Sequence, residues 1–282
     1  MDMYLVEPDE LQGLLNSPDL VIIDCSWNIP EAGRDMAAEF LAGHIPTARF
    51  LDLDAISDRT SPYVNMMPSP DQFAQEVGRL GISNDVQVVL YDSGYVSARV
   101  WWMFRVFGHE KVAILNGGWK RWKQEGRPVE SGEAAPVPPL RFTASQAAGG
   151  VAGWADVLAA LKDGSAQVVD ARTKERFNGE LPSGYPGVAG GHMPGAVNIP
   201  WAKMIPQSGD FTFVSPEVSR GIFAKVGIDT ARPILSTCGS GVTAAILVFQ
   251  LARLGRAGVL LYDGSWHEWG QRPDLPKASV KD

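Results

Sequence analysis

The stretch AGHIP, residues 42–46, returns almost unchanged as GGHMP, residues 190–194. The two histidines of these stretches are separated by 192 − 44 = 148 positions. Four further pairs of segments recur at nearly the same interval: VIID (21–24) and QVVD (167–170), SPDQF (69–73) and SPEVS (215–219), LGI (80–82) and VGI (226–228), and LNGGWKRW (115–122) and LYDGSWHEW (261–269). Because one register holds along the chain, the sequence indicates a duplicated domain.

A segment of different composition lies between the two copies. Residues 125–150, EGRPVESGEAAPVPPLRFTASQAAGG, are rich in Pro, Gly and Ala and lack the periodicity of a helix or strand. We therefore predict a first domain at residues 1–125, a linker at 126–150 and a second domain at 151–282. A chain of 282 residues is long enough for two such domains.

Strand-like and helix-like segments alternate inside each copy. The short β-branched runs LVIID (20–24) and VQVVLYD (86–92) are typical of strands buried on both faces. Longer apolar runs, SARVWWMFRVFG (97–108) and TAAILVFQLARLG (243–255), predict buried helices. This alternation favours an α/β fold in which each domain has a mainly parallel central sheet covered by helices on both faces. Ligands of such folds bind at the carboxyl ends of the strands.

Composition and charge exclude several classes of protein. A net charge of −7 argues against nucleic acid or an anionic membrane as a partner. Only two cysteines are present, without the paired Cys or His spacing of a zinc site, so we expect no metal, no cofactor and a reduced, cytoplasmic setting. The acidic opening MDMYLVEPDELQ does not resemble a secretory or transit signal, and no apolar window approaches the roughly 18 residues of a membrane span.

Cys238 lies in the stretch STCGSGVTAA, residues 236–245, after a strand-like run and before a helical one. At that place backbone N–H groups and the positive end of a helix favour an anion, and a thiolate is the reactive form of cysteine. Gly239 and Gly241 allow the backbone to turn tightly around it. The alternative is a buried core thiol. However, the first copy has Asp92 at the matching place, and a structural cysteine would not be expected to alternate with a charged aspartate.

Several motifs together resemble the two-domain rhodanese family of sulfurtransferases: CGSGVTA from Cys238 onward, the GHIP and GHMPG pair, SDRTSPY (57–63), RVWWMFRVFGH (99–109) and YDGSWHEW (262–269). The resemblance covers nearly the whole chain. It implies two tandem rhodanese-like domains with the active site between them. It also implies that Cys238 takes up sulfane sulfur as a persulfide and passes it to an acceptor such as cyanide, a thiol or a thioredoxin-like protein.

The residues after the cysteine distinguish two branches of the family. Members that use thiosulfate resemble CRKGVT, where two cations face a dianionic donor. This chain has Gly239 and Ser240 in those places, which is similar to the CGSGVT of the branch that uses 3-mercaptopyruvate. A compact carboxylate donor needs less positive charge, and the Ser240 hydroxyl can support proton transfer or hydrogen-bond the departing enolate. The amides around Gly239, Gly241, Val242 and Thr243 are expected to hold the donor and the persulfide.

Three further residues of the second domain are candidates for donor binding. Arg176, in DARTKERFNGE, matches the arginine with which the family holds the substrate carboxylate, and a guanidinium suits a carboxylate bidentately; the alternative is a surface arginine beside Glu175. A second family arginine is replaced by Tyr185, whose hydroxyl can donate one hydrogen bond. Arg172 either adds positive potential or forms a structural ion pair with Asp170.

The resemblance also implies residues of the first domain. Trp27, Asp54 and the NMMP segment (65–68) are expected to face the cysteine, with Asp54 working together with Ser240; Trp27 is equally well explained as an interface aromatic. Asn65 replaces a frequent histidine, so a serine-histidine-aspartate relay is incomplete. His44 and His192 recur in both copies, which favours a structural turn, and Cys25 is expected to be a packed thiol.

Two other classes of protein are alternatives to a mercaptopyruvate or thiosulfate sulfurtransferase. Phosphatases of related fold need an arginine six positions after the cysteine, where this chain has Ala244. A non-catalytic redox or interaction module would not need the intact Cys238 loop. The sequence therefore favours a sulfurtransferase.

Overall fold

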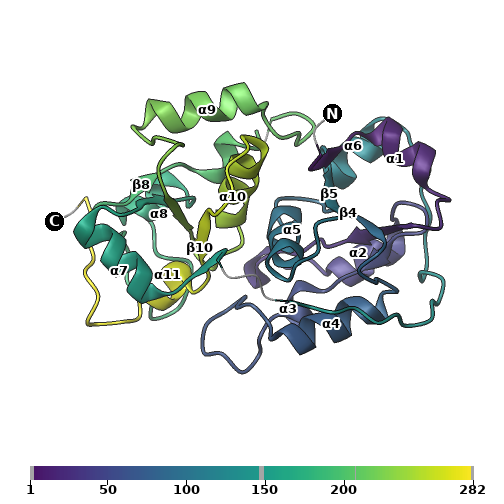
Figure 1. Ribbon diagram of the computed structural model, residues 1–282, viewed down its shortest axis with the longest axis horizontal. Coiled ribbons are helices and arrows are strands. Elements are labelled where there is room, and N and C mark those ends of the chain that lie inside the picture. Colours follow the sequence, from purple (N-terminus) through teal and green to yellow (C-terminus); the bar gives the residue numbers. More distant parts are fainter. Residues whose placement is uncertain (1–2, 146–148, 207, 281–282) are drawn as a thin grey trace. The chain divides into compact units, whose positions relative to one another are not determined.

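The computed structural model describes residues 3–145, 149–206 and 208–280, and the chain divides into two compact units (Figure 1). Unit 1 comprises Met1–Asp58, Pro68–Ala147 and Pro206–Phe213. Unit 2 comprises Arg59–Met67, Ala148–Ile205 and Val214–Asp282. Each unit therefore contains one short segment from the opposite half of the sequence.

Unit 1 is built on a parallel sheet of five strands in the order β1-β5-β4-β2-β3, with helices packed on both faces. The strands are β1 (Leu5–Val6), β2 (Leu20–Asp24), β3 (Arg49–Phe50), β4 (Gln87–Tyr91) and β5 (Val112–Leu115). The helices are α1 (Pro8–Leu14), η1 (Pro30–Ala32), α2 (Met36–Ala42), α3 (Leu53–Ile56), α4 (Pro70–Arg79), α5 (Ser97–Val106) and α6 (Gly118–Gln124). The predicted strands end at the carboxyl edge where Asp24 and Asp92 lie.

Unit 2 repeats this architecture with the equivalent sheet order β6-β10-β9-β7-β8, again parallel. Its strands are β6 (Val151–Ala152), β7 (Gln167–Asp170), β8 (Val197–Asn198), β9 (Ile234–Thr237) and β10 (Leu260–Tyr262). Its helices are α7 (Trp154–Asp163), α8 (Lys174–Asn178), η2 (Trp201–Lys203), α9 (Pro216–Lys225), α10 (Ala244–Arg253) and α11 (Ser265–Trp269). The predicted duplication and the predicted α/β fold class are both confirmed.

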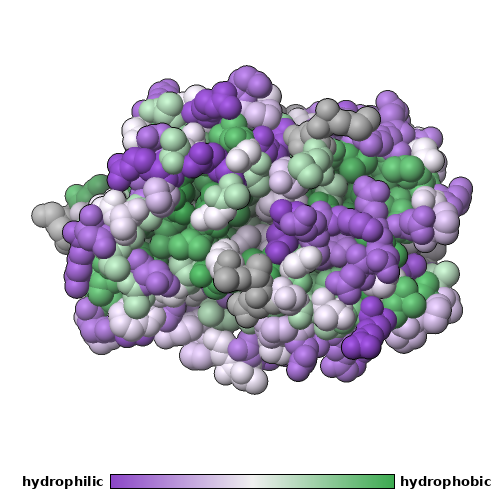
Figure 2. Space-filling view, viewed as in Figure 1, coloured by the Kyte–Doolittle hydropathy of each residue, from purple (hydrophilic) through white to green (hydrophobic). Residues whose placement is uncertain are grey.

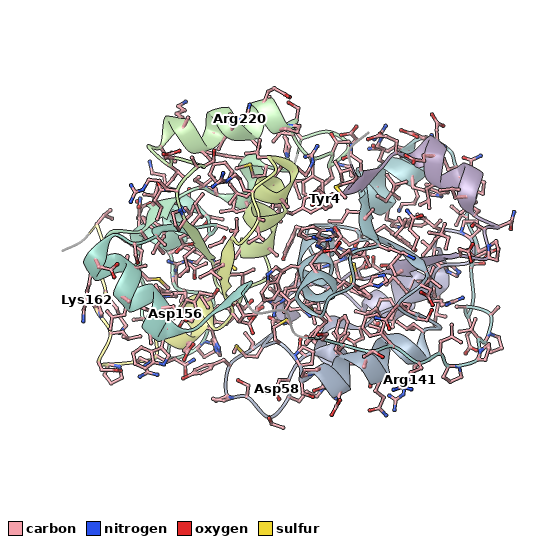
Figure 3. The ribbon with its side chains drawn as sticks, viewed as in Figure 1. Tyr4, Asp58, Arg141, Asp156, Lys162 and Arg220 are labelled. Carbon is pink, nitrogen blue, oxygen red and sulfur yellow. The ribbon has the colours of Figure 1, made fainter. Side chains whose placement is uncertain are left out.

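Local sequence signals account for how the helices begin. The Ser69 hydroxyl accepts a hydrogen bond from the Gln72 N–H and Pro70 is the first residue of α4. Ser215 and Pro216 start α9 in the same way. In α7 the Asp156 carboxylate, labelled in Figure 3, accepts from the Gly153 N–H at 2.8 Å. These bonds satisfy donors that a helix leaves without intrahelical partners.

The repeated histidines have the same structural role in both units. His44 stacks on Phe40 with 4.0 Å between ring centroids, and its Nδ1 lies 2.8 Å from the Phe40 carbonyl oxygen. His192 stacks on Phe177 at 4.0 Å, with Nδ1 2.9 Å from that residue's carbonyl oxygen. The GHxP motif is therefore a structural turn, as expected.

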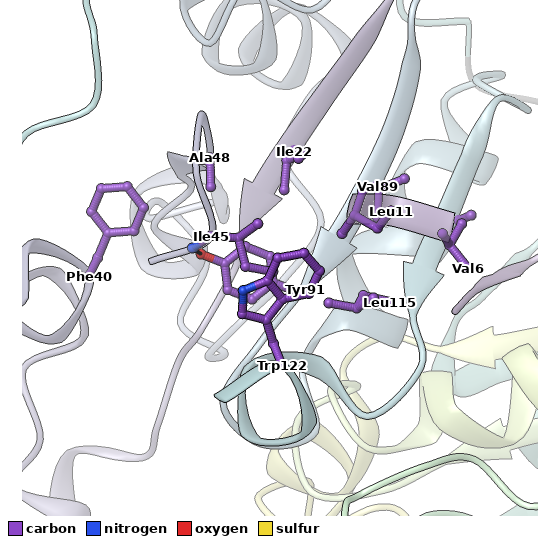
Figure 4. Packing of buried hydrophobic residues seen from close by; sticks show 11 residues of the cluster. Val6, Leu11, Ile22, Phe40, Ile45, Ala48, Val89, Tyr91, Leu115 and Trp122 are labelled. Carbon is purple, nitrogen blue, oxygen red and sulfur yellow. Dashed lines mark hydrogen bonds between the residues drawn. The ribbon is translucent and has the colours of Figure 1, made fainter. Parts of the chain in front are cut away.

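Buried apolar side chains fill the space between sheet and helices in each unit. Figure 4 shows one such cluster in unit 1, in which the Tyr91 hydroxyl accepts a hydrogen bond from the Ile45 N–H at 3.2 Å. The corresponding cluster of unit 2 contains Tyr262, Trp266 and Trp269. On the face drawn in Figure 2, hydrophilic and apolar residues are interspersed. Within the described ranges, no helix has the length and apolar character needed to cross a membrane.

The aspartates that end β2 in unit 1 and β7 in unit 2 have different surroundings. Asp170 of unit 2 is fully buried and ion-paired with Arg172 at 2.7 Å. Asp24 of unit 1 has Ser26 where unit 2 has the arginine. Burial therefore raises the pKa of Asp24 from 3.8 to about 6, although a hydrogen bond from the Ser26 N–H partly opposes the shift.

We expect Asp24→Asn to stabilise the protein above pH 7. A carboxyl whose pKa is raised on folding favours the native state in its neutral form, so this contribution is lost as the pH rises from about 4 through 6. A neutral amide should recover at most about 3 kcal/mol at pH 8. Differential scanning calorimetry at pH 5 and 8 measures this.

The matched variant is Asp170→Asn, which leaves the buried Arg172 cation without its carboxylate partner. It should lower the free energy of unfolding by about 3–5 kcal/mol at both pH values. A melting temperature of Asp24→Asn that falls between pH 5 and 8 as steeply as that of the parent protein would contradict the assignment.

Candidate active site

Cys238 lies at the carboxyl end of β9, the central strand of the unit 2 sheet, and is 1% exposed. Its backbone is fixed on both sides. The Cys238 N–H donates to Ser265 Oγ at 3.1 Å, and its carbonyl oxygen accepts from the Trp266 N–H at 2.9 Å. The cysteine thus lies at the strand end that the sequence predicts.

Ser265 is a site residue that sequence reasoning missed. Besides the Cys238 N–H, its hydroxyl accepts from Thr237 Oγ1 at 3.3 Å and donates to the Tyr262 carbonyl oxygen at 2.8 Å. Its backbone has φ 49°, a left-handed conformation that is strained for a residue other than glycine. The first copy has Gly118 at this place, with φ 51°. The difference between Gly118 in the first copy and Ser265 in the second could have identified Ser265 from the sequence, in the same way that Asp92 identified Cys238.

The equivalent loop of unit 1 reveals how this loop type binds an anion. The Asp92 carboxylate accepts hydrogen bonds from the backbone N–H groups of Gly94, Val96 (2.9 Å) and Ser97 (2.5 Å). Unit 1 therefore fills its loop with its own side-chain anion.

The matching N–H groups in unit 2 belong to Ser240, Val242 and Thr243. Within the part of the chain that the structure describes, none of the three has a protein hydrogen-bond acceptor. Gly241, between them, has φ 78°, which glycine adopts without strain. This loop is therefore available to an anion on or next to the Cys238 sulfur.

Tyr185 lies against the cysteine loop. A side chain at Gly239 would stand 3.0 Å from the Tyr185 hydroxyl. The Tyr185 ring contacts His267 edge-on at 4.6 Å between centroids, and the His267 N–H donates to the Gly239 carbonyl oxygen at 2.8 Å. The structure thus brings Tyr185 to the site, together with a histidine that the sequence did not single out.

His267 is held in one orientation by the segment 59–67. Its Nδ1 accepts a hydrogen bond from the Val64 N–H at 3.2 Å, and its ring contacts Tyr63 at 6.0 Å. The Met67 N–H donates to Asp263 at 2.7 Å in the same region. Burial lowers the pKa of His267, which favours the neutral ring. The wall that Tyr185 and His267 form beside the loop is therefore uncharged at neutral pH.

Arg176 supplies a cation close to this wall. Its side chain packs against Gly184, where an added Cβ would lie 2.7 Å from Arg176 Nη1. Gly184 directly precedes Tyr185. In the described ranges the Arg176 guanidinium forms no ion pair, and the Arg176 backbone N–H is held by the Thr173 hydroxyl at the start of α8. An uncommitted guanidinium beside the loop suits a small anion.

Arg172 is engaged differently. It is 4% exposed, ion-paired with Asp170, bonded to the Gly191 carbonyl oxygen at 2.9 Å and stacked on Trp266 at 4.5 Å. This arrangement favours the structural alternative for Arg172.

The remaining candidates fall in different units. Asn65 of the NMMP segment belongs to unit 2 and is buried. Trp27 and Asp54 belong to unit 1, where Trp27 Nε1 donates to the Asp54 carboxylate at 2.8 Å. Their part in the site stays a prediction. Cys25 is fully buried and donates to the Tyr91 carbonyl oxygen at 3.3 Å, as a packed thiol would.

Known proteins resemble this chain over nearly its full length. The family described as "Rhodanese-like domain" matches residues 7–125 and 153–272. A 3-mercaptopyruvate sulfurtransferase of Escherichia coli is 40% identical over 281 residues, covering 99% of both chains. A thiosulfate sulfurtransferase of Bos taurus is 39% identical over 260 residues, covering 90% of this chain and 86% of the relative. The solved structure of SseA from E. coli, named as a 3-mercaptopyruvate sulfotransferase, has a TM-score of 0.85 and 38% identity over 93% of this chain and 98% of its own.

Gly184→Ala should weaken binding of a small carboxylate by displacing the Arg176 head. Loss of one charge-assisted hydrogen bond corresponds to about a tenfold rise in dissociation constant. Pyruvate, measured by isothermal titration calorimetry, is the probe.

Gly187→Ala is the control, because Gly187 also has positive φ (75°) but has no atom within 4 Å of an added Cβ. It bears the same backbone strain without touching Arg176. Equal weakening in both variants would show that strain, and not the arginine, is responsible.

Proposed function

Because the chain belongs to the rhodanese-like family, we propose that it is a 3-mercaptopyruvate sulfurtransferase. It would transfer sulfane sulfur from 3-mercaptopyruvate through a Cys238 persulfide to a thiol or cyanide, with release of pyruvate. The observation that carries the proposal is the neutral cysteine loop, whose N–H groups have no protein acceptor in the described ranges, together with Arg176, whose guanidinium has no ion-pair partner there.

In the first step the Cys238 thiolate attacks the sulfur of the donor. The new S–S bond forms as the C–S bond of the donor breaks, and its electron pair leaves on the carbon as the enolate of pyruvate. A proton then converts the enolate to pyruvate. The Ser240 hydroxyl is placed in the loop to hydrogen-bond this enolate or to pass the proton.

In the second step an acceptor thiolate attacks the outer sulfur of the persulfide. The bond between the two sulfur atoms breaks, and the Cys238 thiolate is regenerated. The N–H groups of Ser240, Val242 and Thr243 stabilise the anion in both steps, because they are preorganised and need not turn toward the charge as it develops.

Donor selection follows from the charges around the loop. Arg176 provides one bidentate partner for the single carboxylate of mercaptopyruvate, and the Tyr185 hydroxyl can add a hydrogen bond. Gly239 and Ser240 bring no cation to face a dianion. A thiosulfate sulfurtransferase is the second candidate, since a bovine relative of that name is 39% identical.

We propose a division of labour between the halves of the chain. Residues 1–125 would form a non-catalytic domain, because Asp92 occupies its anion-binding loop; 126–150 would be the linker and 151–282 the catalytic domain. Trp27 and Asp54 would approach Cys238 from the first domain. Both cysteines are free thiols, which supports a reducing, cytoplasmic setting. The thioredoxin-like acceptor rests on the family resemblance alone.

Cys238 should gain about 32 Da, one sulfur atom, after treatment with mercaptopyruvate. Intact-protein mass spectrometry measures the adduct. Cys238→Ser should take up no sulfur, and Cys25→Ser, which removes the buried thiol, should behave as the parent protein. Sulfur on Cys25 alone would overturn the assignment of the nucleophile.

Arg176→Ala should raise KM for mercaptopyruvate about tenfold or more while changing kcat less, since the arginine binds the carboxylate in the ground state as well. The parent protein should have a higher kcat/KM for mercaptopyruvate than for thiosulfate in a steady-state cyanide assay. The opposite preference would establish the second candidate.

A further inference from the structure

Residues 133–139 of unit 1 cross its surface as a strap tied at both ends. The Gly132 N–H donates to the Leu41 carbonyl oxygen at 2.8 Å, and the Leu140 N–H donates to the Gly78 carbonyl oxygen at 2.9 Å. Between these ties, EAAPVPP forms no hydrogen bond to the rest of the described chain. Its three prolines have no N–H to donate. Between its two ends, the strap is therefore not held to the rest of the described unit by main-chain hydrogen bonds.

A cavity of about 470 Å³ lies under the strap. Its floor is formed by α2, β3 and the end of α4, which contribute Phe40, Leu41, Phe50 and Leu80. The strap contributes Glu133 together with alanine, proline and valine side chains. Cavities of 300–1,000 Å³ lined mainly by apolar side chains are typical of small-molecule sites. Leu41 is 45% exposed at its rim.

The cavity also has a cationic edge. Arg49, on β3, is partly buried, and burial lowers its pKa, so its charge is incompletely solvated. In the described ranges its guanidinium has one hydrogen-bond acceptor, the Leu80 carbonyl oxygen, and no carboxylate. Arg79, the other cation of the lining, is paired with Glu76 at 2.7 Å. Arg49 is thus the cation available to an anionic ligand.

The duplication provides an internal comparison for Arg49. In the sheet register, β3 places Arg49 opposite Ile23, and β8 places Val197 opposite Val169 at the equivalent position. Phe50 corresponds in the same way to Asn198. The fold therefore accepts an aliphatic residue at the position of Arg49. Neither the arginine nor the phenylalanine beside it is needed to make this strand.

We propose that the cavity under the strap binds a small amphipathic anion, with the apolar body between Phe40, Phe50 and the strap and the acidic group on Arg49. A medium-chain aliphatic acid and an aromatic acid share this chemistry. The site lies in unit 1 and does not depend on the reaction at Cys238. It would give the domain without a nucleophile a ligand of its own.

The test is a titration of the full-length protein with decanoate, 4-phenylbutanoate, decanol and decyltrimethylammonium, each competing with the fluorescent probe 1-anilinonaphthalene-8-sulfonate. Probe and acids should bind with a 1:1 stoichiometry, and a stronger response to decanoate or to phenylbutanoate distinguishes the two sources. Decanol and the cationic amphiphile should compete at least tenfold less well. Equal competition by all four compounds would overturn the proposal.

Ala37→Trp is the decisive variant, because Ala37 is exposed on α2 and lines the cavity, so an indole there fills it. Ala38→Trp, one position away on the same helix and outside the lining, is its control. Ala37→Trp should weaken decanoate binding at least tenfold, Ala38→Trp less than twofold, and neither should change sulfur transfer. Equal binding by both variants would refute the site.

Arg49→Val, which introduces the residue of the second copy, tests the charge. It should weaken decanoate about tenfold and leave decanol unchanged. Lys162→Gln, which removes an exposed cation of unit 2 (Figure 3), is the control for net charge. If Arg49→Val does not fold by circular dichroism, the tryptophan pair and the ligand series still decide the question.

Discussion

One backbone hydrogen bond recurs in both units and fixes the residue at the end of the central strand, on which the anion-binding loop depends. The Trp119 N–H donates to the Asp92 carbonyl oxygen, and the Trp266 N–H donates to the Cys238 carbonyl oxygen, both at 2.9 Å. The bond joins the end of the central strand to the turn after the last strand of each sheet. Because it uses only main-chain atoms, the residue at the strand end can change from aspartate to cysteine without changing the loop.

Given that fixed backbone, the chemistry of each unit depends on which charge fills the loop. A carboxylate in the first loop satisfies three N–H groups permanently. The cysteine in the second loop leaves the equivalent N–H groups available to an anion that binds reversibly. The neighbouring aspartates show the same divergence, since Asp170 has acquired an arginine partner and Asp24 has not. At these two places the copies thus differ in how a buried charge is balanced.

The features that could be predicted from the sequence are those that depend on short repeated motifs or on regular apolar periodicity. Repeated motifs and alternating apolar runs predicted the duplication, the parallel sheets and the strand end at Cys238, because each depends on local propensity or on periodicity. Ser265 and His267 were missed, although both lie in the repeated motif LYDGSWHEW. Their contacts to Cys238 and Gly239 join residues far apart in the chain, and no local pattern encodes such pairs. The cavity under the strap was missed for the same reason.

The segments that cross between halves of the sequence bear on how the chain can be divided. Residues 59–67 supply the N–H groups that bind His267 and Asp263 in unit 2. In the other direction, the Phe213 N–H donates to Asn116, and the Phe211 ring lies 4.2 Å from Lys120 Nζ in unit 1. Cutting the chain within residues 126–150 would therefore separate each of these segments from the unit in which it packs. Each sequence half therefore supplies a segment that the opposite unit uses in its own packing.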